Sequence, residues 1–153
     1  MSTPQPASDD IRFMGRAIAL ARDRMGQTWP NPAVGCVIVK DGEVIGAGHT
    51  QPAGQAHAEI AALRDAEARG NSVRGATAYV TLEPCNHHGR TGPCSDALVD
   101  AGLARVVAAL TDPNPLVAGQ GLARLEAAGI AVRSGVLAPA AHELNIGFFS
   151  RMQ

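Results

Sequence analysis

Four side chains that can hold a metal or move a proton stand in two short stretches of the sequence. His57 and Glu59 lie two residues apart in "QAHAEIAAL", and Cys85 and Cys94 stand at the two ends of "CNHHGRTGPC". One imidazole and two thiolates make three zinc ligands and leave a fourth position for water, as in catalytic rather than closed structural sites. The two thiolates also balance the charge of the ion. We therefore expect one Zn²⁺ per chain, bound by His57, Cys85 and Cys94.

Glu59 is the candidate for proton transfer beside this metal. A zinc ion lowers the pKa of a bound water from ~15.7 towards about 7, and the reaction then needs a group that takes and returns protons. Glu59 is close enough along the chain to face the metal without binding it. We expect it to act as general acid and base.

A closed structural zinc site is the alternative interpretation of the same residues, with His87 or His88 as the fourth protein ligand. That interpretation would leave Glu59 without a role. The third cysteine, Cys36, stands in the apolar run "AVGCVIV" and is expected to be a packed core residue.

A helix and a β-hairpin are predicted for the first third of the chain. Residues from about 8 to 25 follow a helical period, with Asp10 among the acids of the first turn. The apolar face is formed by Ile11, Met14, Ile18 and Met25. The run 33–49 is typical of two strands joined by the turn dipeptide "DG". The first of these strands is apolar on both faces, so we expect it inside a covered sheet.

Helices and strands alternate through the rest of the chain. The predicted helices cover about 57–69, 94–101, 121–129 and 139–149, and the predicted strands cover 75–82, 104–110 and 130–136. This order predicts one α/β domain with helices on both faces of the sheet. His57 and Cys94 then open helices, and Cys85 follows a strand that ends near Glu83. Sites in such sheets form at the carboxyl ends of strands, where helix N-termini point and favour thiolates.

The composition limits the classes of function. The chain has 153 residues, 46% of them hydrophobic and 3% aromatic, which suits one domain with a core of Ala, Val, Leu and Ile. A net charge of -1 argues against binding long nucleic acid. No apolar run has the length of a membrane span, and the first residues do not resemble a signal peptide, so we expect a cytoplasmic protein. Residues 1–7 are expected to be a disordered tail and 8–150 the functional domain.

The motifs together resemble a known enzyme family. H-A-E followed by P-C-x₈-C is similar to the zinc-dependent nucleobase deaminases. The stretches "TWPNPAVGCVIVKDGEVIGAGH", "TLEPCNHHGRTGPCSDAL", "DPNPLVAGQGLARLEAAGI" and "LNIGFFSRM" resemble the deaminase half of the bifunctional riboflavin-biosynthesis deaminase/reductases, from about residue 11 to 152. The resemblance implies a cytidine-deaminase-like fold, a three-layer α/β/α sandwich around a mixed sheet of about five strands that opens with a β-hairpin.

The resemblance also implies a reaction and a set of substrate contacts. The family hydrolyses the 2-amino group of 2,5-diamino-6-ribosylamino-4(3H)-pyrimidinone 5′-phosphate, giving 5-amino-6-ribosylaminouracil 5′-phosphate and ammonia. The positions that match its substrate contacts are Asn31 for the pyrimidine, His87, Arg90 and Thr91 near the phosphate, and Asp112 and Asn114 near the ribose. A histidine on the substrate side of the family's site is replaced here by Thr50, so the contact at that position is expected to differ.

Two other functions stay open at this point. One is a deaminase of another base, nucleoside or nucleotide, such as cytosine, guanine or a tRNA adenosine. The other is a non-catalytic module stabilised by zinc. Arg90 and the "DPNP" segment favour a small phosphorylated substrate, and Glu59 argues against a non-catalytic module.

The family's reductase half has no counterpart in the sequence. We therefore expect no nicotinamide cofactor on this chain, which is either a stand-alone deaminase or one whose reductase domain is separate or deleted. The family leads us to expect a homo-oligomer, a dimer or a tetramer, with no membrane or nucleic-acid partner.

Overall fold

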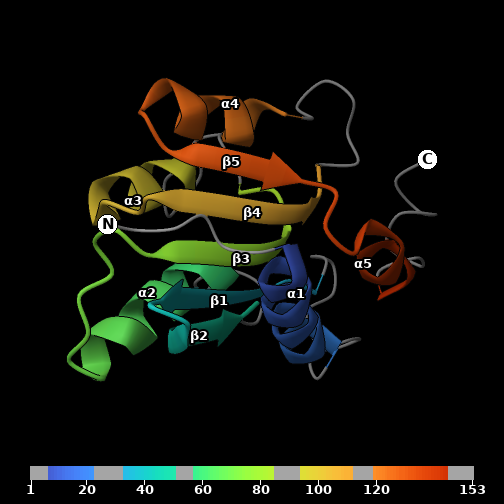
Figure 1. The fold of residues 1–153 in the computed structure, drawn as a ribbon, viewed down its shortest axis with the longest axis horizontal. Helices are drawn as coiled ribbons and strands as arrows, with labels where there is room; N and C mark the ends of the chain where they lie inside the picture. The colour runs from blue at the N-terminus through green and yellow to red at the C-terminus, as the bar shows by residue number, and fades with distance from the viewer. Residues whose placement is uncertain (1–6, 23–32, 51–56, 85–93, 112–118, 145–153) are drawn as a thin grey trace.

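Five strands form one mixed sheet in the order β2-β1-β3-β4-β5 (Figure 1). The computed structural model describes residues 7–22, 33–50, 57–84, 94–111 and 119–144. The strands are β1 (Gly35–Lys40), β2 (Glu43–His49), β3 (Thr77–Leu82), β4 (Arg105–Leu110) and β5 (Ala131–Ser134). The helices are α1 (Ala7–Arg22), α2 (Ala58–Ala68), α3 (Cys94–Ala101), α4 (Gln120–Ala127) and α5 (Ala138–Leu144).

The predicted hairpin is confirmed. β1 pairs antiparallel with β2, and the turn residues Asp41 and Gly42 have φ values of 53° and 79°. Two positive φ values in a two-residue turn are the geometry that an Asp-Gly pair favours. β1 also pairs with β3, so the strand predicted to lie inside the sheet does so.

The other three strands run parallel. β3 pairs with β4 and β4 with β5 in parallel register. Their carboxyl ends therefore meet at one edge of the sheet, the edge that the sequence predicts for the site. The ends predicted for the first and last helices, near residues 25 and 149, lie outside the described residues.

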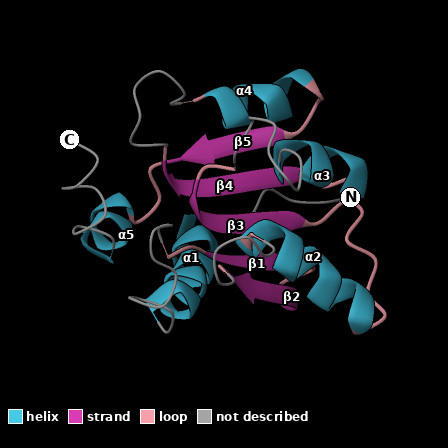
Figure 2. Cartoon of the chain, turned by 180° about the vertical axis from the view of Figure 1, so that it is seen from behind, coloured by secondary structure: helices cyan, strands magenta, loops and turns pink. Residues whose placement is uncertain are grey.

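Helices cover both faces of the sheet, which confirms the three-layer sandwich. α2, α3 and α4 lie on one face (Figure 2), and α1 and α5 lie on the other. The larger core cluster packs Leu98, Leu122 and Leu125 against the strands, and the second packs Phe13 and Met14 against Tyr79. Within the described ranges, no helix combines the length and the apolar character needed to cross a membrane.

The first turns of α1 differ in part from the prediction, although Met14 and Ile18 of the predicted apolar face are buried. Ile11, expected to point to the core, is 53% exposed, whereas Asp10 is fully buried. The carboxylate of Asp10 accepts hydrogen bonds from Tyr79 Oη at 2.8 Å, from both Nη atoms of Arg105 at 2.8 Å and from Arg133 Nη1 at 2.6 Å. These donors come from three strands, and they turn the side of α1 that bears Asp10 towards the sheet.

The ionised form of Asp10 is favoured in this network. Burial raises the pKa of Asp10, but the hydrogen bonds from Arg105, Tyr79 and Arg133 outweigh it and hold the pKa below its usual value. Burial of the phenol raises the pKa of Tyr79, and the hydrogen bond to the Asp10 carboxylate raises it further.

α2 approaches β2 so closely that the contact requires glycine. A Cβ atom on Gly48 would lie 2.5 Å from the nitrogen of Ala62 and 2.7 Å from the oxygen of Ala58. A Cβ on Gly46 would lie 2.6 Å from the oxygen of Ala62 and 2.8 Å from the Cβ of Ala66. The helix backbone therefore rests on the strand backbone, with only alanine side chains between them.

Two polar side chains fix α2 along the same strand. Asp65 Oδ2 accepts a hydrogen bond from the nitrogen of Ala47 at 2.9 Å, and Asn71 Nδ2 donates to the oxygen of Ile45 at 3.0 Å. β2 is an edge strand of the sheet, so these contacts satisfy backbone groups that would otherwise be open to pairing with another chain.

We predict that Gly48→Ala destabilises the fold. The added methyl group overlaps the α2 backbone, and overpacking of this kind costs about 1–3 kcal/mol. Gly15→Ala in α1 is the matched control, because nothing lies within 4 Å of its Cβ position. Replacing a helical glycine by alanine should raise the free energy of unfolding by about 0.5–1 kcal/mol. Urea unfolding followed by circular dichroism measures both; a Gly48→Ala variant as stable as the wild type would contradict the close contact.

Candidate active site

His57 stands at the start of α2, as predicted. It is the N-cap residue, with extended backbone angles of φ −73° and ψ 165°, and Ala58 is the first helical residue. Its side chain makes no capping hydrogen bond. The half-buried imidazole is therefore held at the helix start without being used to cap it.

Glu59 follows in the first turn of α2 and is only 5% exposed. A helix N-terminus carries partial positive charge, which favours a carboxylate in the first turn. The contact of α2 with Gly48 fixes the depth of this turn against β2, because Ala58 and Ala62 flank it. Glu59 thus combines low solvent access with a position in a turn whose backbone lies directly against β2.

Cys36 is a core residue, which confirms the prediction. It is fully buried in β1 within the larger core cluster. Burial and the negative charge of Glu59 raise the pKa of its thiol well above the usual value. The thiol stays protonated, and a protonated thiol is a poor metal ligand.

The two predicted cysteine ligands belong to neighbouring elements. Cys94 is the first residue of α3, and Cys85 follows Glu83 and Pro84 after the end of β3. Cys85 lies outside the described residues, and those that are described contain no group of three or more His, Cys, Asp or Glu that could hold a metal. α2 and α3 contact each other on the same face of the sheet (Figure 2).

The donor chemistry of these elements fits zinc. His57 at the start of α2 and Cys94 at the start of α3 belong to helices on the same face of the sheet, and Cys85 follows β3 in the sequence. Imidazole and thiolate are the borderline and soft ligands that zinc takes in proteins. Which atoms bind the ion stays a prediction.

Thr50 joins the end of β2 to the segment that precedes β1. It is 7% exposed. Its Oγ1 accepts a hydrogen bond from the nitrogen of Val34 at 2.7 Å and donates to the oxygen of Val34 at 3.2 Å. The backbone nitrogen of Thr50 also donates to that oxygen at 2.8 Å. The hydroxyl therefore has a structural contact, and a contact with substrate stays a prediction.

The other predicted substrate residues lie outside the described residues. They are Asn31, His87, Arg90, Thr91, Asp112 and Asn114. Two of the described segments lead directly to them. Ala33 and Val34 follow Asn31 after one proline, and Thr111, directly after the end of β4, precedes Asp112.

Glu83 is a polar residue of this sheet edge whose contacts the sequence does not reveal. It is 6% exposed, and its Oε1 and Oε2 accept hydrogen bonds from the nitrogens of Gly119 at 2.7 Å and Leu122 at 3.3 Å. The only sequence signal is an acidic residue directly after a buried strand and before Pro84. Its partners lie 36 and 39 residues away, where no local pattern points to them.

Comparison with known proteins gives consistent matches. A family model described as the cytidine and deoxycytidylate deaminase zinc-binding region matches residues 7–110. The riboflavin biosynthesis protein RibD of Escherichia coli (strain K12) is 58% identical over 144 residues, which are 94% of this chain and 38% of that protein. The diaminohydroxyphosphoribosylamino-pyrimidine deaminase of Buchnera aphidicola is 48% identical over 145 residues, which are 95% of this chain and 97% of that protein.

A solved structure agrees with these matches. Acinetobacter baumannii RibD superimposes with a TM-score of 0.90 at 52% identity, over 96% of this chain and 40% of that one. The chain therefore spans well under half the length of the two RibD proteins and nearly the whole length of the Buchnera protein.

We predict that the Thr50 hydroxyl contributes to stability. Thr50→Val keeps the shape of the side chain but leaves the nitrogen of Val34 without this acceptor, which costs about 1–3 kcal/mol of unfolding free energy. Thr50→Ser keeps the hydroxyl and should stay within about 1 kcal/mol of the wild type. Urea unfolding measures the free energy of unfolding of both variants and of the wild type. A Thr50→Val variant as stable as Thr50→Ser would show that the contact with Val34 contributes nothing.

Proposed function

The chain belongs to the cytidine and deoxycytidylate deaminase zinc-binding family, and from this premise we propose that it removes the 2-amino group of 2,5-diamino-6-ribosylamino-4(3H)-pyrimidinone 5′-phosphate by hydrolysis. The products are 5-amino-6-ribosylaminouracil 5′-phosphate and ammonia. The observation that carries the proposal is the buried Glu59 in the first turn of a helix that opens with His57, at the start of an element packed rigidly on the sheet. The family membership confirms the resemblance inferred from the motifs.

The substrate is taken from the relative that this chain matches over nearly its whole length, the Buchnera pyrimidine deaminase. The sequence supports a phosphorylated substrate, because Arg90 stands between the two cysteines with His87, His88 and Thr91 beside it. A guanidinium group recognises phosphate oxygens in a bidentate manner. In this proposal Arg90, His87 and Thr91 bind the phosphate.

The remaining contacts orient the ring and the sugar. Asn31 binds the pyrimidine through its amide, and Asp112 and Asn114 bind the ribose hydroxyls. Thr50 stands at the position where the family has a histidine, and its hydroxyl bridges to Val34, three residues after Asn31. Thr50 therefore supports the segment that carries Asn31, in addition to any contact with the substrate.

His57, Cys85 and Cys94 hold one zinc ion per chain in this proposal. Zinc, when bound, supplies a positive charge that lowers the pKa of a water molecule and makes a nucleophile available near neutral pH. The N-termini of α2 and α3 add partial positive charge where thiolates must form.

Glu59 moves the protons. Water adds its oxygen to the ring carbon that bears the amino group, and the electron pair of the adjacent C=N bond moves to the ring nitrogen. Glu59 takes the proton that the water loses and gives it to that nitrogen. Glu59, now again a carboxylate, takes the proton of the added hydroxyl group and delivers it to the amino group. The oxygen's electron pair forms the C=O bond of the product, the carbon–nitrogen bond to the amino group breaks, and the amine leaves as ammonia. The low exposure of Glu59 keeps bulk water from exchanging these protons.

We predict that Glu59→Gln abolishes turnover and keeps the zinc. Glutamine retains the size of the side chain but cannot carry a proton, and general acid–base catalysis contributes about 10²–10⁴-fold to the rate. The matched control is Glu67→Gln, an exposed position on the same helix. Ammonia release at saturating ribotide and zinc content per chain are measured for both variants. Activity of Glu59→Gln within about threefold of the wild type, or loss of its zinc, would contradict the assigned role.

We also predict that the enzyme discriminates by the phosphate. The wild type should release ammonia from the ribotide with a higher kcat/KM than from the dephosphorylated riboside, deoxycytidine monophosphate or guanine. Arg90→Ala should lower kcat/KM for the ribotide by about 10- to 100-fold, as expected for a lost charge-assisted contact. It should leave kcat/KM for the riboside unchanged.

The control for Arg90→Ala is Arg64→Ala, an exposed arginine on α2. If the wild type prefers guanine or deoxycytidine monophosphate, the substrate is wrong although the reaction class holds. If Arg90→Ala has the same kcat/KM for the ribotide as the wild type, the phosphate is bound by other residues.

A further inference from the structure

We propose that Glu83 is a positioning residue for substrate binding: its carboxylate and its backbone hold together the two described ends of the segment that carries Asp112 and Asn114. The inference rests on the proposed function, because those two residues are assigned there to the ribose. It adds a residue that does not itself touch the substrate.

The carboxylate of Glu83 supplies the cap that α4 lacks. The N-cap residue of α4 is Gly119, which has a φ of 84° and no side chain with which to cap the helix. Glu83 accepts hydrogen bonds from the nitrogens of Gly119 at 2.7 Å and Leu122 at 3.3 Å. The nitrogen of Leu122 is the third of the helix, a donor that a capping side chain normally satisfies. A negative charge at this position is also favoured by the helix dipole.

The backbone of Glu83 holds the other end of the segment. Its nitrogen donates to the oxygen of Leu110 at 2.8 Å, which extends the parallel pairing of Leu82 with Leu110 by one hydrogen bond. β4 ends at Leu110, and α4 begins at Gln120. Glu83 is thus hydrogen-bonded both to the last residue of β4 and to the start of α4, the two elements that flank residues 111–119.

The start of α4 also touches the residue after Glu83. A Cβ atom on Gly121 would overlap the oxygen of Pro84, and it would lie 3.4 Å from Glu83 Oε2. Only glycine allows this approach, so the helix start sits directly on the end of β3. A side chain at this position would push the helix start away from Pro84.

The contacts of Glu83 add to the apolar packing of α4 a direction that the packing does not supply. α4 is already held to the sheet by Leu122 and Leu125, which are buried in the larger core cluster. A buried carboxylate is costly unless its hydrogen bonds are made, and an apolar side chain could fill the same space. What the carboxylate adds is a fixed direction for the first turn of α4. We expect its loss to affect the segment before that turn more than the packing behind it.

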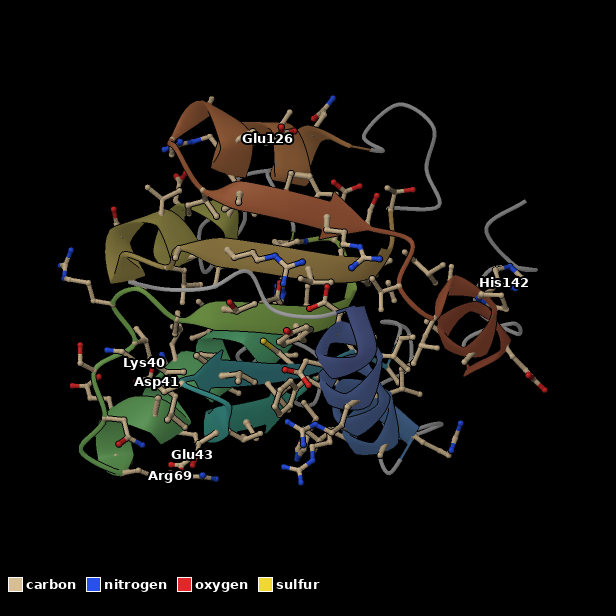
Figure 3. All side chains as sticks on the ribbon, in the orientation of Figure 1. Lys40, Asp41, Glu43, Arg69, Glu126 and His142 are labelled. Carbon is tan, nitrogen blue, oxygen red and sulfur yellow. The ribbon has the colours of Figure 1, made fainter. Side chains whose placement is uncertain are left out.

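The test compares Glu83→Gln with the wild type in steady-state kinetics on the ribotide. Glutamine keeps the size of the side chain, but its amide nitrogen cannot accept a hydrogen bond, and the negative charge is lost. KM should rise about 5- to 20-fold, while kcat stays within about twofold. Zinc content per chain should be unchanged. The matched control is Glu126→Gln, an exposed glutamate on α4, the helix that Glu83 caps; it is labelled in Figure 3.

A double-mutant cycle with Asp112→Ala tests whether Glu83 acts through that segment. If it does, Glu83→Gln should raise KM little further once Asp112 is absent, because interacting residues give non-additive effects. Fully additive effects on KM would overturn the inference, since a general loss of stability adds to any other change.

The remaining outcomes also decide the matter. Loss of zinc from Glu83→Gln would assign Glu83 to the support of Cys85 instead. If Glu83→Gln folds and its KM equals that of the wild type, the inference is overturned and the proposed function stands. If the unmodified protein releases no ammonia from the ribotide, both the inference and the proposed function are wrong. If Glu83→Gln does not fold, Glu83→Asp, which keeps the charge on a shorter side chain, is used; if neither variant folds, Glu83 serves stability and the inference is wrong.

Discussion

The contact between the backbones of α2 and β2 fixes the position of the helix turn that carries Glu59, the proposed proton carrier. Gly46 and Gly48 remove the layer of side chains that normally separates a helix from a strand, and the alanines of α2 fill the space that remains. Asp65 and Asn71 then prevent the helix from sliding along β2. The first turn of α2 is consequently held in depth and in register, and that turn carries Glu59 with His57 directly before it. A proton carrier must keep its geometry within tenths of an ångström during reaction, and a backbone contact provides that better than flexible side chains can.

On the opposite face of the sheet, α1 is held by charged hydrogen bonds and not by a close contact of backbones. Asp10 enters the second core cluster from α1 and is bonded to Tyr79, Arg105 and Arg133, one residue from each of three neighbouring strands. An isolated carboxylate would be unstable in such a place, but four short hydrogen bonds and two guanidinium charges compensate for the lost hydration. This network lies on the far side of the sheet from α2, so it orders the strands without placing charge against Glu59.

Buried polar groups recur at the edge of the sheet where the parallel strands end. Thr50 binds the backbone of Val34, and Glu83 binds the start of α4 and the end of β4. Each of them ties two segments that flank residues assigned to the substrate. Apolar packing is non-directional, whereas a hydrogen bond fixes both a distance and an angle. The segments that meet at this edge are therefore held relative to one another by directional contacts.

The sequence by itself determined the order of helices and strands, the hairpin turn, the α/β class and the positions of His57, Glu59 and Cys94 at helix starts. These features follow from periods, turn dipeptides and ligand types that act over a few residues. The burial of Asp10 and the exposure of Ile11 could not be predicted, because Ile11 fits the apolar period of α1 and only the distant donors to Asp10 decide which of the two residues is buried. The same holds for Gly46, Gly48 and Glu83: each looks unremarkable among its neighbours, and each acquires its role from a partner that folding brings within contact from another part of the chain. Tertiary structure decided these points because burial and close approach are properties of pairs of segments, and one segment read alone does not contain them.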